Sequence, residues 1–417
     1  MITCANNTLT ISHPDLEVVL QKCAGRYVEE WLPKLLVEDV PSAMETLLAR
    51  DFNWISDTER QSLRQTVLAS PHQWISKSFP EIVTRRVKDS AARSQISFQR
   101  TLRLPDDGNT YPLPPGLGRF PLRPIMPYAH RVSRAWAQRG GVLMPMYQAE
   151  ALWLSFTTKY PYALKVGTGL VNAITGEGWA GGLPRTPQGY LVLPEQPWLD
   201  GYCVEKGVIR QFVAARLGDG YTAEEQLNAT SRGGLQLEAF PLKPAILFEK
   251  QLKDSLPKSV ADLLRDYLSD TQTGRYAYCL GEASGPGMGL GAGGKMKQEI
   301  YEDPWESQDW DLTQPSRVWI HLCDAVHWFH ITGELPPQKP IRAKDYARYG
   351  FPWFDYYRDD LAALEGGTAL GKLKSIFALG KKKGDMTIPQ EESVTPGPIL
   401  ALGPHAPGNQ VPEWDGQ

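Results

Sequence analysis

Cysteine is scarce in this chain of 417 residues, and its few copies follow no disulfide or metal-binding pattern. There are five cysteines, an odd number, and no two of them stand in a C-x-x-C pair. A chain of this length buries roughly three quarters of the surface that its unfolded form exposes, so it needs no disulfide or metal to hold its core together. The cysteine usage therefore predicts free thiols in a reducing compartment, and we expect a cytoplasmic protein.

Long apolar runs are also missing. No stretch approaches the ~20 apolar residues that a membrane-spanning helix requires, and the first residues lack the basic and apolar regions of a secretory signal. The formal net charge is only −3, so there is no overall positive field that would attract nucleic acid or an anionic membrane. These absences predict a soluble protein with neither nucleic acid nor a membrane among its partners.

Strand-like and helix-like segments are segregated along the chain, which favours an α+β fold over a doubly wound parallel sheet. We expect a helical N-terminal region over residues 1–95, a β-rich core with mainly antiparallel strands and flanking helices over 96–379, and a Pro/Gly-rich irregular tail over 380–417. The short cationic run at 381–383 is flanked by glycines, and we interpret it as a solvated linker.

Several helix boundaries are marked by local sequence signals in the N-terminal region. Ser42 and Ser56 are each followed three residues later by Glu, the spacing of a capping box. Ser70 precedes a proline, a combination that is typical of a helix start. Pro80 is expected to interrupt or kink the helix that follows, because proline lacks a backbone N–H group.

Strand signals begin where Ile96 and Phe98 fall on one face of a period-two alternation. The next segment, 105–127, contains seven prolines among apolar residues, so we expect a rigid loop that packs on the core. Residues 248–269 return to helical spacing, and 276–280 are expected to form a strand that enters a glycine-rich loop. Further strands are expected at 162–166, 170–174, 190–193, 208–214, 235–240 and 399–402.

The most unusual segment is the glycine-rich run from Gly285 to Lys297, GPGMGLGAGGKMK. Successive backbone N–H groups in such a loop can converge on an anion, and lysines beside them add positive charge. The run lacks a βαβ context, and Met296 stands where a P-loop requires Ser or Thr, so its match to nucleotide-binding motifs is weak. The alternative interpretation is a mobile or tightly turning structural loop. The residues predicted to bind a small anionic ligand are Gly289, Gly291, Gly293, Gly294, Lys295 and Lys297.

A second candidate site contains the carboxylates Glu195, Asp200 and Glu205, with Trp198 between them. Two carboxylates in environments of different polarity can act as general acid and general base, as in enzymes that cleave glycosidic bonds. An adjacent Trp side chain can stack on a sugar ring. The alternative interpretation is that these residues are turn residues and surface charges.

A third candidate is Cys323, His327 and His330, which would lie at positions i, i+4 and i+7 of a helix expected over residues 316–331. This spacing places three zinc-competent side chains on one helix face. The surrounding residues are strongly apolar, and cysteine also behaves as a small hydrophobic residue. We therefore predict a buried structural helix and no bound metal.

An aromatic and acidic run, YGFPWFDYYRDD, extends from Tyr349 to Asp360. If this run is exposed, it would form a platform for a ligand or a protein partner. If it is buried, it would belong to the core, which is the interpretation we favour. The proline-rich segment 105–127 together with this run offers an alternative function in protein interaction. The sequence assigns no catalytic residue and no cofactor.

Four runs of the sequence resemble a family of bacterial and fungal proteins of unknown function. The resemblance covers residues 97 to 380 and leaves out the helical N-terminal region. It implies one integrated β-containing unit, and it implies no activity, cofactor or catalytic residue. The runs are GVLMPMYQAEALWLSF (141–156), PEQPWLDGYCVEKGVIRQFVAARLGDGYTAEEQ (194–226), MGLGAGGKMKQEIYEDPW (288–305) and AKDYARYGFPWFDYY (343–357).

The sequence thus leads to a working hypothesis with two alternatives. The hypothesis is a protein that binds a small anionic ligand at the glycine-rich loop 285–297, with Lys295 and Lys297 as charge partners. The alternatives are a structural or protein-interaction role, and a carbohydrate-active enzyme that uses the three carboxylates named above.

Overall fold

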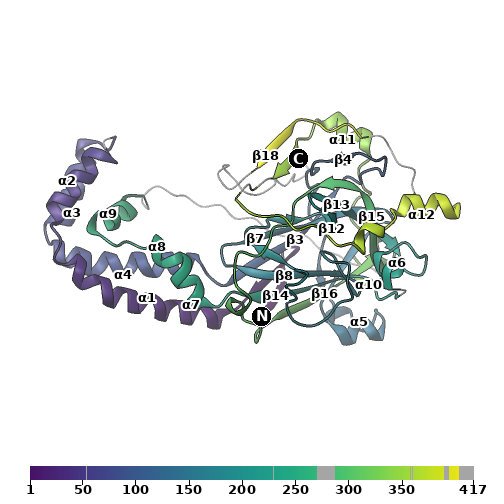
Figure 1. The fold of residues 1–417 in the computed structure, drawn as a ribbon, viewed down its shortest axis with the longest axis horizontal. Helices are drawn as coiled ribbons and strands as arrows, with labels where there is room; N and C mark the ends of the chain where they lie inside the picture. The colour runs from purple at the N-terminus through teal and green to yellow at the C-terminus, as the bar shows by residue number, and fades with distance from the viewer. Residues whose placement is uncertain are drawn as a thin grey trace. The chain divides into compact units, whose positions relative to one another are not determined.

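The chain has an α+β fold that divides into two compact units, each assembled from distant parts of the sequence (Figure 1). The computed structural model describes residues 1–52, 54–228, 230–269, 287–356, 358, 360–388 and 394–402. A helical unit comprises the described residues within 13–92 and 242–269, and a β-rich unit comprises the remainder. The division expected from the sequence was contiguous, at residues 95 and 379, whereas both units of the structure are discontinuous.

The helical unit is built on two long helices, α1 (Pro14–Leu35) and α4 (Pro71–Asp89), which pack against each other. Its helices bury residues such as Leu20, Phe79 and Leu263 in a shared core. No helix in the described ranges is both long and apolar enough to cross a membrane. The remaining elements of the unit are α2 (Val40–Arg50), α3 (Asp57–Leu68), α7 (Pro244–Leu247), the π-helical turn η2 (Phe248–Leu252), α8 (Lys253–Ser255) and α9 (Val260–Ser269).

The predicted helix signals are confirmed at two of four positions. Ser56 and its partner Glu form a complete capping box at the start of α3, and Ser70 is the N-cap of α4 with proline at the first helical position. The prediction for Ser42 is wrong, because Asp39 caps α2 and accepts a hydrogen bond from the Ser42 backbone N–H. The interruption that was one of the two effects expected at Pro80 is also absent. Helix α4 continues through this residue, since its buried apolar face holds the helix in place.

The β-rich unit is organised around one large, mainly antiparallel sheet (Figure 1). Its strands follow the spatial order β1 (Ile2–Ala5), β2 (Thr8–Ser12), β3 (Arg93–Thr101), β7 (Ala151–Thr158), β13 (Val208–Arg216), β15 (Gly287–Lys297), β16 (Ser316–Asp324), β14 (Leu235–Pro241), β8 (Tyr162–Thr168) and β10 (Leu191–Leu193). Shorter strands extend or cover this path: β4 (Thr110–Tyr111), β5 (Arg123–Pro124), β6 (Val142–Met146), β9 (Val171–Asn172), β11 (Trp198–Leu199) and β12 (Gly201–Glu205).

The sheet confirms the strands expected from the sequence. Four of the five expected internal runs coincide with strands, and 170–174 contains only the two-residue strand β9. The expected edge strand is β18 (Ile399–Leu402), which pairs with β17 (Trp353–Tyr356) in a separate small sheet. The expected helical N-terminus begins instead with the hairpin of β1 and β2, which pairs with β3. The strand expected at 276–280 lies outside the described residues.

The proline-rich segment 105–127 packs on this sheet as an ordered, largely irregular chain, as predicted. Leu113, Phe120 and Leu122 from this segment are buried. The helices of the β-rich unit are α5 (Arg134–Arg139), α6 (Ala223–Asn228), α10 (Ala325–Thr332), α11 (Ala343–Tyr349) and α12 (Ile376–Lys383), with short 3-10 turns at Met126–Tyr128, Ser307–Asp309 and Leu370–Lys372. The linker expected at 381–383 is wrong: these lysines form the last turn of α12, where positive charge is favourable.

Candidate functional site

The glycine-rich run is a strand and not a loop. Its described residues form β15, which pairs with β13 along one edge, with an irregularity at Gly293 and Gly294. On the other edge the two ends of β15 pair with β16 and β4. Residues 285 and 286 lie outside the described ranges. Backbone groups that pair with neighbouring strands are not free to converge on an anion. The loop geometry on which the anion prediction rested is therefore wrong for the glycines at 289, 291, 293 and 294.

Close packing explains why these positions are glycine. A Cβ atom at Gly294 would lie 2.2 Å from the carbonyl oxygen of Pro105, and one at Gly291 would lie 2.6 Å from the carbonyl oxygen of Tyr221. Real Cβ atoms do not approach backbone atoms so closely. Only a residue without a side chain fits where other backbone segments cross the strand this tightly.

The two lysines of this run are already engaged with carboxylates. Lys295 Nζ lies 3.1 Å from Glu205, and Lys297 Nζ lies 2.5 Å from Asp355. An anion at this strand would have to replace one of these carboxylates and would find no converging N–H groups. The structure thus offers a packing role for the segment that sequence patterns alone did not indicate.

The three candidate carboxylates occupy different environments. Asp200 is 0% exposed and burial raises its pKa well above the usual range, while the Glu205 side chain is exposed and paired with Lys295. Glu195 is partly buried, and burial raises its pKa as well. A fully buried carboxyl group cannot contact a sugar, so Asp200 and Glu205 share no accessible surface.

The helix expected over 316–331 is wrong in its first half. Residues up to Asp324 form strand β16, and only the remainder is helical, in α10. Cys323 therefore lies buried on a strand, where its thiol donates to the carbonyl oxygen of Met144, while His327 and His330 are exposed on α10. The spacing that suggested three ligands on one helix face does not exist in the fold.

The core position favoured from the sequence is confirmed for the middle of the aromatic run, and the other described residues of the run are partly buried or exposed. Trp353 and Phe354 are each 1% exposed and pack with Leu113 and Trp198 in one apolar cluster. Tyr349 is the exception, with 62% of its surface exposed. The run therefore contributes stability to the β-rich unit more than it contributes an open platform.

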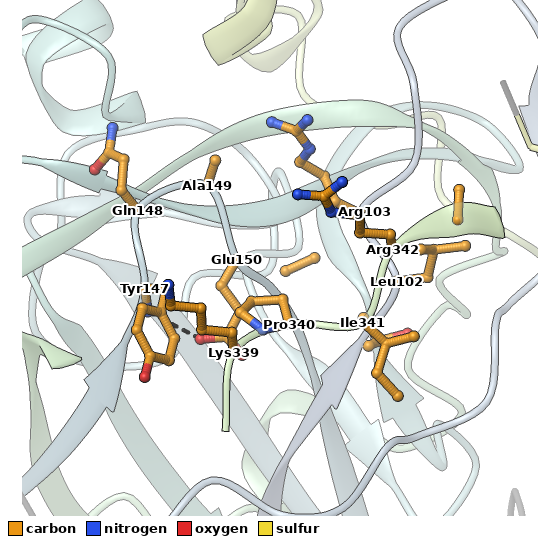
Figure 2. A pocket seen from close by; sticks show the side chains of 13 residues that line it. Leu102, Arg103, Tyr147, Gln148, Ala149, Glu150, Lys339, Pro340, Ile341 and Arg342 are labelled. Atoms are coloured by element: carbon orange, nitrogen blue, oxygen red, sulfur yellow. Dashed lines mark hydrogen bonds between the residues drawn. The ribbon is translucent and has the colours of Figure 1, made fainter. Parts of the chain in front are cut away.

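A cavity of 540 Å³ in the β-rich unit brings together three segments that are distant in sequence (Figure 2). It is lined by residues 101–103 at the end of β3, residues 147–151 between β6 and β7, and residues 339–343 leading into α11. We call this cavity the basic pocket, because three of its lining residues carry positive charge. Its size falls in the range of about 300–1,000 Å³ that is usual for small-molecule sites.

The residues between β6 and β7 form one wall of the pocket as a tight turn, and hydrogen bonds within the turn fix its geometry. Glu150 accepts a hydrogen bond from the backbone N–H of Tyr147 through Oε2 at 2.9 Å, and the Glu150 N–H donates to the Tyr147 carbonyl oxygen at 3.1 Å. Ala149 adopts a φ of +62°, a conformation that costs a non-glycine residue about 1–2 kcal/mol. Such strain persists where the surrounding structure enforces it, and it is often found at functional sites.

Two side chains donate hydrogen bonds to the backbone that leads into the opposite wall, at residues 337 and 338. The Tyr147 hydroxyl donates to the Pro337 carbonyl oxygen at 2.8 Å, and Arg100 Nη2 donates to the Gln338 carbonyl oxygen at 2.6 Å. Burial raises the pKa of Tyr147, so its hydroxyl remains a proton donor at neutral pH. The two bonds fix the chain just before Lys339, the first residue of this wall.

The charges of the basic pocket do not balance. Glu150 is the one acidic residue of its lining, and Arg100 neutralises it through bonds of 2.8 and 2.5 Å to Oε1. The three lining cations are Arg103, Lys339 and Arg342. Among the described residues, neither Lys339 nor Arg342 has a carboxylate partner. Lys339 and Arg342 are both exposed, so water solvates their charges, and their positive potential at the mouth of the pocket would attract an anion.

A second cavity, of 310 Å³, lies in the helical unit and has a different character. It is lined by aromatic side chains, including Phe52, Trp54 and Tyr267, and no cation lines it. Its one acidic residue, Glu59, is used in the capping box of α3. This cavity is therefore not suited to an anionic ligand.

Comparisons with known proteins identify no relative of this chain. No protein-family model, no curated protein and no solved structure matches it.

Proposed function

We propose that this chain binds a small anionic ligand in the basic pocket. The observation that carries the proposal is the charge imbalance: the one acidic residue of the lining is neutralised by Arg100, while Lys339 and Arg342 have no carboxylate partner among the described residues. The expectation of an anionic ligand is kept from the sequence, and its site moves from the glycine-rich segment to this pocket.

Arginine is well suited to this role. The guanidinium group is planar and permanently charged, and it presents parallel N–H donors that match a carboxylate or a phosphate. Figure 2 draws the side chains of Arg103 and Arg342 into the same part of the pocket. The proposal is one of binding, and it assigns no side chain a catalytic role.

The proposal includes a reducing, cytoplasmic environment. The described cysteines are all free thiols, and burial raises the pKa of Cys203 to about 12 and that of Cys4 to about 11. Thiols with a raised pKa are mostly protonated at neutral pH and react slowly. This supports a structural role for these cysteines.

Thermal unfolding in sodium phosphate tests the proposal, with sodium chloride at the same ionic strength as reference. A ligand that binds only the folded state raises the melting temperature by mass action. We expect a rise for the natural sequence and its loss in the double variant Arg103→Ala/Arg342→Ala. Lys295→Ala/Lys297→Ala removes the same charge elsewhere and should retain the rise.

Two results would contradict the proposal. One is an equal rise for the natural sequence and for Arg103→Ala/Arg342→Ala. The other is a rise that disappears only when Lys295 and Lys297 are replaced, because that would return the anion site to β15.

A further inference from the structure

The cations of the basic pocket are divided between its two ends. In Figure 2 the guanidinium groups of Arg103 and Arg342 extend to one end of the view, and the side chain of Lys339 lies beside Tyr147 at the other. The first pair comes from the end of β3 and the start of α11, and Lys339 comes from the segment between α10 and α11. One compact anion placed between the arginines would leave Lys339 without a counterion.

Apart from these cations, the lining is largely apolar and includes Leu102, Ala149 and Ile341. In Figure 2, Ala149 and Glu150 lie between the two ends, and Leu102 and Ile341 lie on the other side of the arginines. Glu150 also belongs to this lining, but its side chain is 1% exposed and paired with Arg100. A ligand body that lies along this lining gains most if it is short and uncharged.

We infer that the ligand of the basic pocket carries two anionic groups, one at each end of a short uncharged body. One group binds between Arg103 and Arg342, and the other binds Lys339. The inference rests on the proposed function, and it deepens it by naming the class of ligand: a small dianion whose charges are separated, such as an unbranched dicarboxylate or a phosphorylated carboxylic acid.

The fastening of residues 337 and 338 positions the backbone at one end of the pocket. Tyr147 and Arg100 hold the carbonyl groups of Pro337 and Gln338 at 2.8 and 2.6 Å. The backbone that presents Lys339 is thus positioned before any ligand arrives. Preorganised groups favour ligands whose own spacing matches theirs, because less conformational freedom is lost on binding.

Calorimetric titration of the full chain with a series of unbranched dicarboxylates, from malonate to pimelate, tests the inference. Each dicarboxylate is compared with the monocarboxylate of the same chain length at constant ionic strength. We expect one chain length to bind at least tenfold more tightly than its monocarboxylate. Lys339→Met should abolish this preference, and the matched control Lys297→Met should retain it.

The outcomes separate the inference from the proposal on which it rests. If dicarboxylates bind no more tightly than monocarboxylates, while both require Arg342, the inference is wrong and the proposed function stands. If Lys339→Met weakens monocarboxylates as much as dicarboxylates, the two-ended arrangement is wrong. If no carboxylate and no inorganic phosphate binds, the proposed function fails and the inference fails with it.

Discussion

Strand β15 and the basic pocket both place lysine or arginine beside small residues, but the two regions differ in how the positive charges are compensated. At β15 the lysines pair with Glu205 and Asp355, and most of the backbone pairs with β13. In the pocket, Lys339 and Arg342 have no such partner among the described residues. A site for an anion is thus distinguished by uncompensated charge around a cavity, and not by the density of glycine and lysine in the sequence.

The largest expected effect comes from the buried ion pair of the pocket wall. Arg100→Ala would leave the Glu150 carboxylate buried without its partner, and breaking such a pair costs about 3–5 kcal/mol. Lys295→Ala is the matched control, because it breaks a pair whose carboxylate is 57% exposed, and pairs of that kind are worth less than about 1 kcal/mol. Chemical denaturation at pH 7 measures both free energies of unfolding.

The pH dependence of the Arg100→Ala variant sharpens the same comparison. Burial raises the pKa of Glu150. When folding raises the pKa of a carboxyl group, the group destabilises the folded state least at a pH below its unfolded pKa of about 4.3. Stability is then lost as the pH rises through the pKa of the folded state. The deficit of the variant should therefore be smaller at pH 5 than at pH 7. An equal deficit at both values, or an equal deficit for Lys295→Ala, would contradict the account of the wall.

The next effect tests the packing explanation of the glycines. Gly294→Ala places a Cβ atom 2.2 Å from a backbone oxygen, and overpacking of this kind costs about 1–3 kcal/mol or more. The control is Gly181→Ala, because a Cβ atom at Gly181 meets nothing within 4 Å, so we expect a change within about 0.5 kcal/mol. A harmless Gly294→Ala, measured by urea unfolding, would remove the packing role and reopen the case for a ligand.

A smaller effect is expected for the bond that fastens the two pocket walls. Tyr147→Phe removes the hydrogen bond to the Pro337 carbonyl group and keeps the ring. We expect a loss of stability of about 1 kcal/mol. The affinity for the preferred dicarboxylate should fall by a few fold because Lys339 is held less firmly. An affinity that does not change, in a titration monitored by calorimetry, would show that this bond does not position the lysine.

The smallest effect is expected at the lysines of β15. Lys295→Ala/Lys297→Ala removes two solvent-exposed ion pairs, and each pair of this kind typically contributes less than about 1 kcal/mol to stability. Phosphate affinity should stay within twofold of that of the natural sequence. A tenfold loss in an equilibrium titration would contradict the comparison between the two regions.

Local sequence patterns correctly predicted structural features that depend only on neighbouring residues. The alternation that marks Ile96 and Phe98 and the capping signal at Ser56 each depend on neighbouring residues, and both are confirmed. The strand β16 was mistaken for a helix because its apolar residues continue into α10 without interruption, and a short apolar run has no clear period.

The basic pocket could not be predicted in this way. Arg103 and Arg342 are 239 positions apart in the sequence, and neither belongs to a recognisable motif. The strained conformation of Ala149 leaves no sequence signal either, because the residue is not the glycine or asparagine that a left-handed position usually selects. Sites assembled by long-range topology become visible only in the fold.

Residue-resolved footprinting measures the central claim directly, because it reads both regions in one sample. Lysines are acylated and arginines are modified with a dicarbonyl reagent, with and without saturating phosphate, and the modified peptides are quantified by mass spectrometry. We predict that phosphate protects Arg342 and leaves Lys295 and Lys297 unchanged. Protection of Lys295 and Lys297, with Arg342 equally reactive in both conditions, would contradict the assignment of the anion site to the basic pocket.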